Sequence, residues 1–171
     1  MEEVDLTESD LGVYLFEENP TPMIIFSRDS LDIKRVNEAA TEQYGYTRKE
    51  FTNLNVKQIR PREDIPKLME DIDRTAHQDY TDTYRHLTKE GELLYVKVQA
   101  KPLNLNSQNL QLAVLNDITE EVEAKIRSQQ AENLANLGWW TYEVKKNQIL
   151  WSKKLYDIFE VDQQSFEATL E

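Results

Sequence analysis

The sequence predicts an α+β fold in which an antiparallel sheet is covered on one face by helices. Three observations support this prediction. Short apolar segments typical of strands occur before residue 37 and again after residue 79, and helical patterns lie between them. The helical segments begin with capping signals. A strand–strand–helix order also recurs about 115 residues after its first appearance.

The composition of the 171-residue chain indicates a globular protein with one ordinary domain and part of a second. It has 32 acidic and 20 basic residues, a net charge of -12, which argues against nucleic acid or anionic membranes as partners. No apolar run approaches the roughly 18 residues of a membrane span, and the acidic start lacks a signal-peptide pattern. We therefore expect a cytoplasmic protein without membrane contact.

No catalytic or metal-binding pattern is visible in the sequence. The chain has no cysteine, which excludes disulfides, thiol catalysis and cysteine-bound metal or flavin adducts. It also lacks a P-loop, a Gly-rich nucleotide loop and a positioned nucleophile with its base. We expect this segment not to be an enzyme. Its last two residues, Leu170 and Glu171, match a cloning scar as well as an ordinary dipeptide.

The first part of the chain predicts a helix and then a hairpin. Residues 7–10 resemble a helix start, and the prolines after Asn19 end the helical pattern. Residues 23–26 and 33–36 are short apolar strands with a tight connection, which favours a hairpin.

Three helical segments follow this hairpin. Asn37 is expected to cap a short helix that Gly45 ends. Residues 47–50 form a capping box for a further helical turn. Apolar residues at helical spacing predict a longer amphipathic helix over residues 64–78.

The second half predicts a three-stranded meander, a helix and the repeated unit. Strands are expected over 83–88, 93–103 and 110–118, with a turn at Gly91 and a polar loop over 104–109. A helix over 119–136 follows, and then strands over 139–144 and 148–151 lead into a helix that begins at Ser152.

Motifs in the first 120 residues resemble those of the PAS domain family. Residues 36–40 (VNEAA) and 44–51 (YGYTRKEF) are similar to its helical signature. Residues 89–91 (KEG) resemble its hairpin motif, and residues 117–120 (DITE) resemble the motif that closes its core and starts a signalling helix. All three occur in order and at the family's spacing.

Residues 137–143 (LGWWTYE) and 150–152 (LWS) resemble the opening of a second PAS domain. The resemblance therefore implies four parts. These are a flanking helix over 1–19, a PAS domain over 20–119, a connecting signalling helix over 120–136, and a partial second PAS domain of two strands and a helix over 137–171.

The resemblance implies a five-stranded antiparallel sheet that encloses a small cavity beneath its helices. Such modules bind small molecules or cofactors and act on a downstream output domain, and a sensor histidine kinase is the first candidate for the parent protein. The alternative is a ligand-free scaffold for dimerisation and protein interaction, in a diguanylate cyclase or a transcription regulator.

Side chains that face the cavity would hold a ligand, and the alternative is that they only fill the core. The inward candidates, taken from helical and strand periodicity, are Ile25, Ala40, Tyr44, Met69, Ile72, Tyr84, His86, Val96, Val98, Leu112 and Val114.

The cofactor is not identified by the sequence. Haem-binding relatives use a histidine on the long helix, but His77 lies at the end of that helix, where it favours the helix dipole instead. His86 lies in a strand where the family usually has an apolar residue, and it is either a satisfied core residue or a ligand or pH contact.

Asp117 and Thr119 join the last strand to the signalling helix, as a cap alone or as a signal relay. A thin apolar stripe on and directly after that helix favours a homodimer, and it consists of Val122, Ile126, Leu134 and Leu137.

Overall fold

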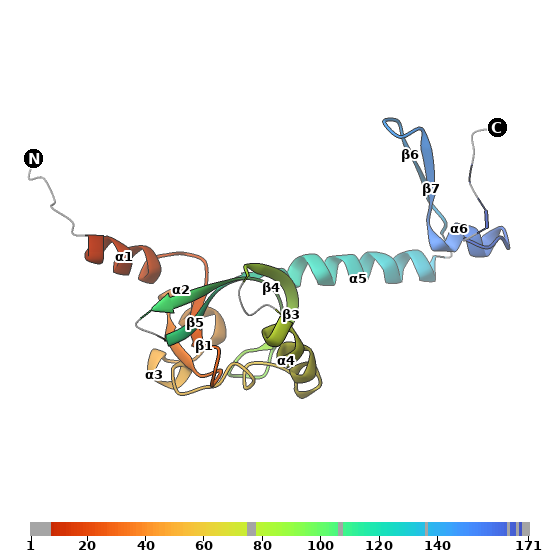
Figure 1. The fold of residues 1–171 in the computed structure, drawn as a ribbon. Helices are drawn as coiled ribbons and strands as arrows, with labels where there is room; N and C mark the ends of the chain where they lie inside the picture. The colour runs from red at the N-terminus through yellow and green to blue at the C-terminus, as the bar shows by residue number, and fades with distance from the viewer. Residues whose placement is uncertain are drawn as a thin grey trace, which may run out of the picture. The chain divides into compact units, whose positions relative to one another are not determined.

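The computed structural model describes residues 8–74, 78–105, 108–135, 137–163, 165, 166 and 168. They belong to two compact units, Met1–Thr119 and Glu120–Glu171. Figure 1 traces the chain through both units, each of which is considered by itself below.

The first unit contains the predicted five-stranded antiparallel sheet. Its strands are β1 (Met23–Ser27), β2 (Ile33–Val36), β3 (Tyr80–Leu87), β4 (Leu93–Leu105) and β5 (Gln108–Asp117). The strand order is β2-β1-β5-β4-β3, and every neighbouring pair is antiparallel. The first hairpin and the meander thus meet where β1 pairs with β5, which confirms the expected α+β fold.

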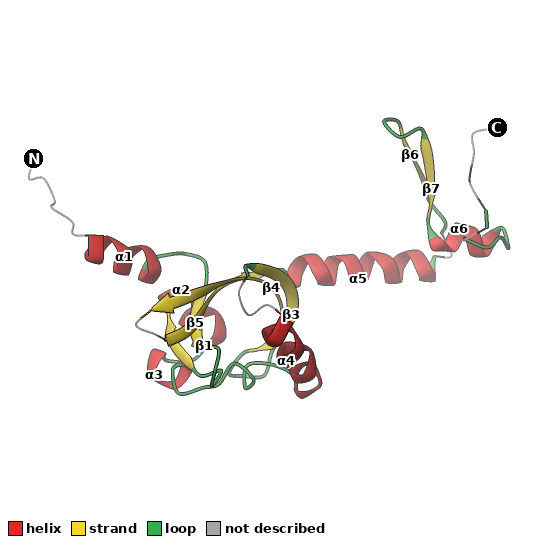
Figure 2. Ribbon diagram, in the orientation of Figure 1, coloured by secondary structure: helices red, strands yellow, loops and turns green. Residues whose placement is uncertain are grey.

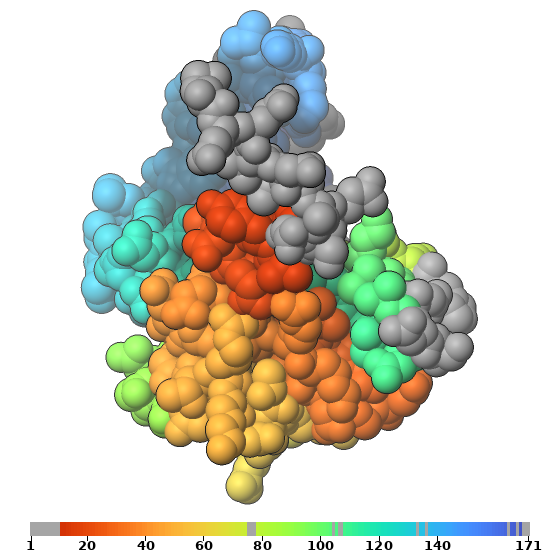
Figure 3. All heavy atoms as spheres, turned by 90° about the vertical axis from the view of Figure 1, so that its left-hand side faces the viewer, coloured from red at the N-terminus to blue at the C-terminus, as the bar shows by residue number. Residues whose placement is uncertain are grey.

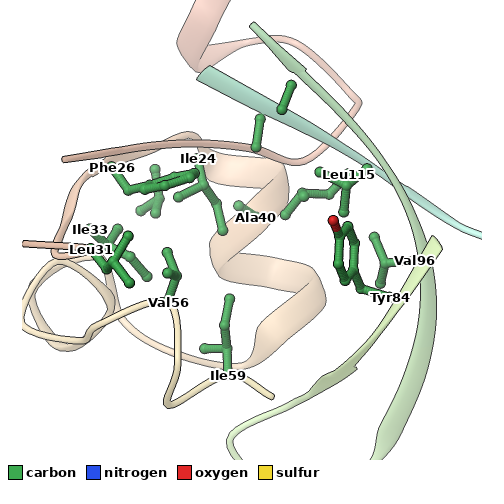
Figure 4. Packing of buried hydrophobic residues seen from close by; sticks show 14 of the residues in the cluster. Ile24, Phe26, Leu31, Ile33, Ala40, Val56, Ile59, Tyr84, Val96 and Leu115 are labelled. Carbon is green, nitrogen blue, oxygen red and sulfur yellow. The ribbon is translucent and has the colours of Figure 1, made fainter. Parts of the chain in front are cut away.

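Helices of the same unit cover one face of this sheet (Figure 2). They are α2 (Glu38–Tyr44), α3 (Arg48–Phe51) and α4 (Ile65–Arg74), and a 3-10 turn, Arg62–Asp64, precedes α4. Buried side chains of these helices and of the five strands form one apolar core. Figure 4 shows Ala40 of the short helix between residues of β1 and residues of β3 and β4.

The capping signals of the sequence position these helices as expected. The Asn37 side chain accepts the Ala40 backbone N–H, and Gly45 ends α2 with a φ of 75°. This left-handed conformation favours glycine. Thr47 and Glu50 form the predicted capping box at the start of α3.

Asn37 also ties α2 to the start of the sheet. It is fully buried. Its Oδ1 accepts the Met23 N–H at 2.8 Å, and its Nδ2 donates to the carbonyls of Asn19 and Thr21 at 3.1 and 2.9 Å. Every polar atom of this amide is satisfied, so one side chain fixes three segments.

Helix α1 (Glu8–Glu17) contacts the surface of this unit near β2 and α3. Glu17 pairs with Arg35 at 2.8 Å and with Arg48 at 2.7 Å. Figure 3 shows α1 in red against the orange residues of the first hairpin and α2. Its apolar side chains Leu11, Tyr14 and Leu15 remain exposed.

Several boundaries differ from the sequence-based expectation, and β3 begins at Tyr80 rather than at residue 83. The described part of the long helix, α4, ends at Arg74, and residues 75–77 lie outside the described residues. The expected loop over 104–109 is shorter, because β4 and β5 continue with the pairs Asn104–Asn109 and Leu105–Gln108. Backbone pairing extends the hairpin through polar residues that carry no strand signal.

The second unit contains α5 (Thr119–Leu134), a hairpin of β6 (Trp140–Glu143) and β7 (Gln148–Trp151), and α6 (Lys153–Ile158). The first residue of α5, Thr119, belongs to the first unit. The Ser152 hydroxyl accepts the Trp139 N–H at 3.0 Å. Trp139, Trp140 and Phe159 are largely exposed. No helix in the described part of the chain has the length and apolar character to span a membrane.

Candidate functional site

The interior of the first unit contains polar side chains as well as the apolar core. Arg28, Arg60, Asp71, His86 and Gln111 are each at least nine-tenths buried. Buried polar groups normally have hydrogen-bond partners, so each of these residues requires an account.

His86 and Tyr44 form the first polar group. The Tyr44 hydroxyl lies 2.6 Å from His86 Nδ1, and both side chains are almost fully buried. Burial, and then the positive charge of Arg60, hold the pKa of His86 well below its usual value of 6.5. Burial likewise raises the pKa of Tyr44. Both groups are therefore neutral near neutral pH.

Tyr84 and Asp71 join β3 to α4. The Tyr84 hydroxyl donates to Asp71 Oδ2 at 2.7 Å, and Arg74 donates to Oδ1 of the same carboxylate at 2.5 Å. Burial, followed by the bond to Asp71, raises the pKa of Tyr84. A buried carboxylate thus has a neutral donor and a cationic donor.

Arg28, directly after the end of β1, connects β5 to α4. Its guanidinium donates to Gln111 Oε1 at 2.5 Å and to the backbone carbonyl of Ile72. The carbonyl belongs to the last turns of α4, where a cation also favours the helix dipole. Arg28 and Asp71 therefore attach this helix to two different strands.

Eight of the eleven predicted pocket residues face the interior. They bring together side chains from the short helix, the long helix and two strands. They are Ala40, Tyr44, Met69, Ile72, Tyr84, His86, Val96 and Val98. Their inward position agrees with both expectations, a ligand cavity and a filled core, so ligand contact by these residues stays a prediction.

The inward assignment of Ile25, Leu112 and Val114 is wrong. Ile25 is half-buried between the buried Ile24 and Phe26, and it pairs with Leu112 on β5. Leu112 and Val114 are likewise half-buried and line an open groove with Gln99 and Lys101. These three side chains lie on the other face of the sheet, because β5 directs Gln111 and Ala113 inward.

The predicted relay residues lie at the junction of β5 and α5. Asp117 Oδ1 accepts the Thr119 N–H at 2.9 Å and the Thr119 hydroxyl at 2.5 Å. The Thr119 hydroxyl oxygen in turn accepts the Tyr95 N–H of β4 at 3.0 Å. Asp117 therefore provides the expected capping contact.

Gln43 contacts one of these predicted relay residues, a contact which the sequence did not reveal. Its Nε2 donates to Asp117 Oδ2 at 3.0 Å, although 74 residues separate the two positions. Gln43 precedes Tyr44 on α2, so adjacent residues of one helix contact the buried histidine and the start of α5.

The expectations for haem and metal both stay predictions. His77 lies outside the described residues, so its predicted capping role stays a prediction. Within the described ranges, no group of three or more histidine, aspartate or glutamate side chains is placed to hold a metal ion.

Sequence reasoning missed the buried arginines and Gln111. Arg60 follows the fully buried Ile59, and Arg28 follows Ser27 at the end of β1. Nothing in these short contexts distinguishes them from surface residues. A polar residue within the apolar strand of residues 110–115 was the one available signal for Gln111.

Comparisons with known proteins agree with this architecture. The PAS domain family model matches residues 20–120. A PAS domain from a two-component sensor histidine kinase superposes with a TM-score of 0.57, at 18% identity over 64% of this chain and 96% of that structure. The PAS domain of an HTR-like protein from Haloarcula marismortui gives a TM-score of 0.58 at 20% identity, over 64% and 91% of the two chains.

Among curated proteins, a probable diguanylate cyclase of Escherichia coli, DgcE, is 20% identical over 139 residues. The aligned region is 74% of this chain but 13% of that relative, so the chain spans a small part of its length. The family match covers more than half of the chain and the fold agrees with it. Residues 20–120 form a sensory domain of signalling proteins, and the chain belongs to the PAS domain family.

Proposed function

We propose that residues 20–119 form a sensory and relay module that binds a small ligand in its interior and transmits the resulting change to α5. The parent protein is a multidomain signalling protein, with a sensor histidine kinase as the first candidate. Residues 120–136 serve as the signalling helix of this protein. The proposed location is the cytoplasm, the expectation from the composition.

The observation that carries this proposal is the pair of contacts made by α2. Tyr44 bonds the buried His86, and its neighbour Gln43 bonds Asp117 at the start of α5. A ligand that displaces Tyr44 would move the same short helix that holds Asp117. Asp117 and Thr119 are then the residues that pass this movement to the helix.

A ligand-free scaffold is the second candidate function. The exposed apolar residues of α1 and the thin stripe on α5 favour it, since such surfaces are typical of interaction sites. In this case the module dimerises, and the output domain is a diguanylate cyclase or a transcription regulator. The similarity to the Escherichia coli diguanylate cyclase supports this choice of output.

Residues 137–171 are proposed to be the opening of a second PAS domain. The antiparallel pair β6–β7 is followed by α6, as β1–β2 is followed by α2. Both short helices begin directly after a strand, at Asn37 and Ser152. The order of elements therefore supports the repeat seen in the sequence.

Native mass spectrometry of the chain purified from cells tests ligand binding. We expect a retained small molecule, which is lost in Ile72→Trp because the indole fills the interior beside α4. Ile126→Trp, at an exposed position on α5, is the matched control and should keep the ligand.

Two results would favour the scaffold instead. One is the absence of any bound molecule in protein from several growth conditions. The other is equal retention in Ile72→Trp and Ile126→Trp, which would place the molecule outside the interior.

A further inference from the structure

Two neighbouring buried side chains of the first unit each have a nitrogen without a hydrogen-bond partner in the part of the chain that the structure describes. Arg60 is 8% exposed and His86 is 1% exposed. Arg60 Nε and His86 Nε2 are both shielded from solvent and have no hydrogen-bond partner among the described residues. The two residues are held together by the backbone, because Leu87 N–H donates to the Ile59 carbonyl at 2.9 Å.

The unpaired nitrogen of His86 is assigned as a donor. Tyr44 has a single hydroxyl proton, and its bond to His86 Nδ1 at 2.6 Å is the one hydrogen bond this hydroxyl makes among the described residues. If the hydroxyl donates, Nδ1 is the acceptor and the ring proton of neutral His86 lies on Nε2. His86 Nε2–H and Arg60 Nε–H are then two buried donors without an acceptor.

The charge of Arg60 also forms no ion pair with a described residue. The ion pairs of the described residues do not include Arg60. Asp64 is near enough to influence it, but that carboxylate is already bound by Arg85 at 2.6 and 2.8 Å. Within the described residues, the guanidinium of Arg60 donates to the Val56 carbonyl at 2.6 Å and lies over the Tyr84 ring at 5.4 Å. A buried cation of this kind is unfavourable until an anion accompanies it.

We propose that a small monocarboxylate binds between Arg60 and His86, with its oxygens accepting hydrogen bonds from Arg60 Nε–H and His86 Nε2–H. This inference rests on the proposed sensory function and names the class of its ligand. A carboxylate has one negative charge, which matches the single charge of Arg60. It also has two acceptor oxygens, one for each of the two unpaired donors. A phosphate would bring more charge and more oxygens than the described donors satisfy.

The surroundings of the two donors favour a short aliphatic ligand. Val56, Ile59 and Tyr84 belong to the apolar core, and Figure 4 shows Ile59 between Val56, which lies beside Leu31 and Ile33, and Tyr84 of β3. A short hydrocarbon tail suits such neighbours, whereas a hydroxylated ligand would require further polar partners.

Nuclear magnetic resonance of the full chain labelled with 15N in its histidines tests this proposal at neutral pH. The probes are acetate and propionate, and the controls are the neutral isosteres acetamide and propionamide at the same ionic strength. We expect a saturable shift of the His86 ring nitrogens with the acids and none with the amides. The chain has two histidines, and the spectrum of His86→Phe identifies the signal of His86.

Variants then test the role of Arg60. Arg60→Gln should weaken acetate binding about tenfold or more, since it removes the charge of one donor. Lys97→Gln, which removes an exposed cation from β4, is the matched control and should leave binding unchanged.

The proposal is overturned if acetate causes no saturable shift, if acetamide causes an equal shift, or if Arg60→Gln folds and binds acetate as tightly. A buried water would then be the partner of the two donors. If Arg60→Gln does not fold, the comparison of acid with amide on the unmodified chain decides alone. A neutral molecule found by native mass spectrometry would keep the sensory function and reject the carboxylate.

Discussion

The hydrogen bond between Tyr44 and His86 connects two nearly fully buried residues on opposite sides of the core. Tyr44 lies on α2 and His86 on β3, so their contact crosses the space between the helices and the sheet. A polar contact at this position is costly to break, because either partner would remain desolvated. It therefore fixes the distance between α2 and β3 more strongly than an apolar contact would.

Tyr44→Phe is expected to lower the free energy of unfolding by roughly 1–3 kcal/mol, because it leaves His86 Nδ1 buried without its partner. Urea denaturation followed by circular dichroism measures this change. Tyr46→Phe is the matched control, since Tyr46 also packs on the core but its hydroxyl makes no hydrogen bond among the described residues. Equal stability of the two variants would contradict the structural role of the bond.

Stability should also depend on pH through His86. Burial and Arg60 lower its folded-state pKa well below 6.5, whereas the unfolded chain binds a proton near that pH. Below about pH 6.5 the unfolded state therefore binds more protons than the folded state. The free energy of unfolding is highest above this pH and declines as the pH falls. The slope is at most about 1.4 kcal/mol per pH unit between about pH 7 and about pH 5.

Denaturation midpoints across this pH range test the assignment. His86→Phe should flatten the dependence, and His77→Gln should keep it. Glu50, whose pKa is lowered to about 2 mainly by its bond to Lys89, contributes at lower pH, when the carboxylates titrate. A slope that disappears in His77→Gln instead would assign the effect to the other histidine.

The turns of this fold depend on two glycines with positive φ. Gly45 ends α2 at a φ of 75°, and Gly91 forms the β3–β4 turn at a φ of 86°. A Cβ at Gly45 would lie 2.9 Å from Glu90 Oε2, the mobile end of a side chain, whereas no atom lies within 4 Å of one at Gly91. Backbone conformation therefore dominates the requirement at both positions.

Gly45→Ala and Gly91→Ala are each expected to destabilise the first unit by about 1–2 kcal/mol. Gly12→Ala is the matched control, because Gly12 lies in α1 with open space around it and alanine has the higher helix propensity. Thermal denaturation of the three variants measures the difference. Destabilisation by Gly12→Ala of the same size would contradict the conformational explanation.

Periodicity predicts the elements well but not the face that β5 presents to the core. Local sequence predicted all five strands in their order along the chain. It also predicted the Asn37 cap, the end of α2 at Gly45 and the capping box at Thr47. On β5 the apolar Leu112 and Val114 indicated the wrong face. Gln111 faces the interior instead, because the buried Arg28 donates a hydrogen bond to its side-chain oxygen. This contact spans 83 residues, so no local pattern contains it.

The candidate site shows the same division between local and distant information. His86 and Tyr44 were predicted to face inward, since strand alternation and helix spacing are local properties. Arg60, whose charge lowers the pKa of His86, comes from a loop, and Gln43, next to Tyr44 on α2, bonds Asp117 at the end of β5. Only the assembled fold brings these residues to one place.

The apolar surface of the chain is distributed unequally between its two units. All members of the core cluster lie between Ile24 and Leu115, within the first unit. In the second unit, Trp139, Trp140 and Phe159 are 45%, 58% and 59% exposed, and Val144 is 76% exposed. Such a concentration of exposed aromatic residues is typical of an interaction surface. A second copy of the chain is the partner that a purified sample provides.

Removal of residues 137–171 should therefore leave the first unit folded and reduce self-association. We expect the melting temperature of the first unit to change by less than about 2 °C, because its core loses no member. Sedimentation velocity over a range of concentrations compares the shortened chain with the full one, and the full chain should associate more strongly. Tyr14→Ser, which removes an exposed aromatic residue of α1, is the control for a different contact. The opposite result would be equal self-association of the shortened and full chains, with self-association lost in Tyr14→Ser. It would show that the contact between copies is made by α1 and not by the second unit.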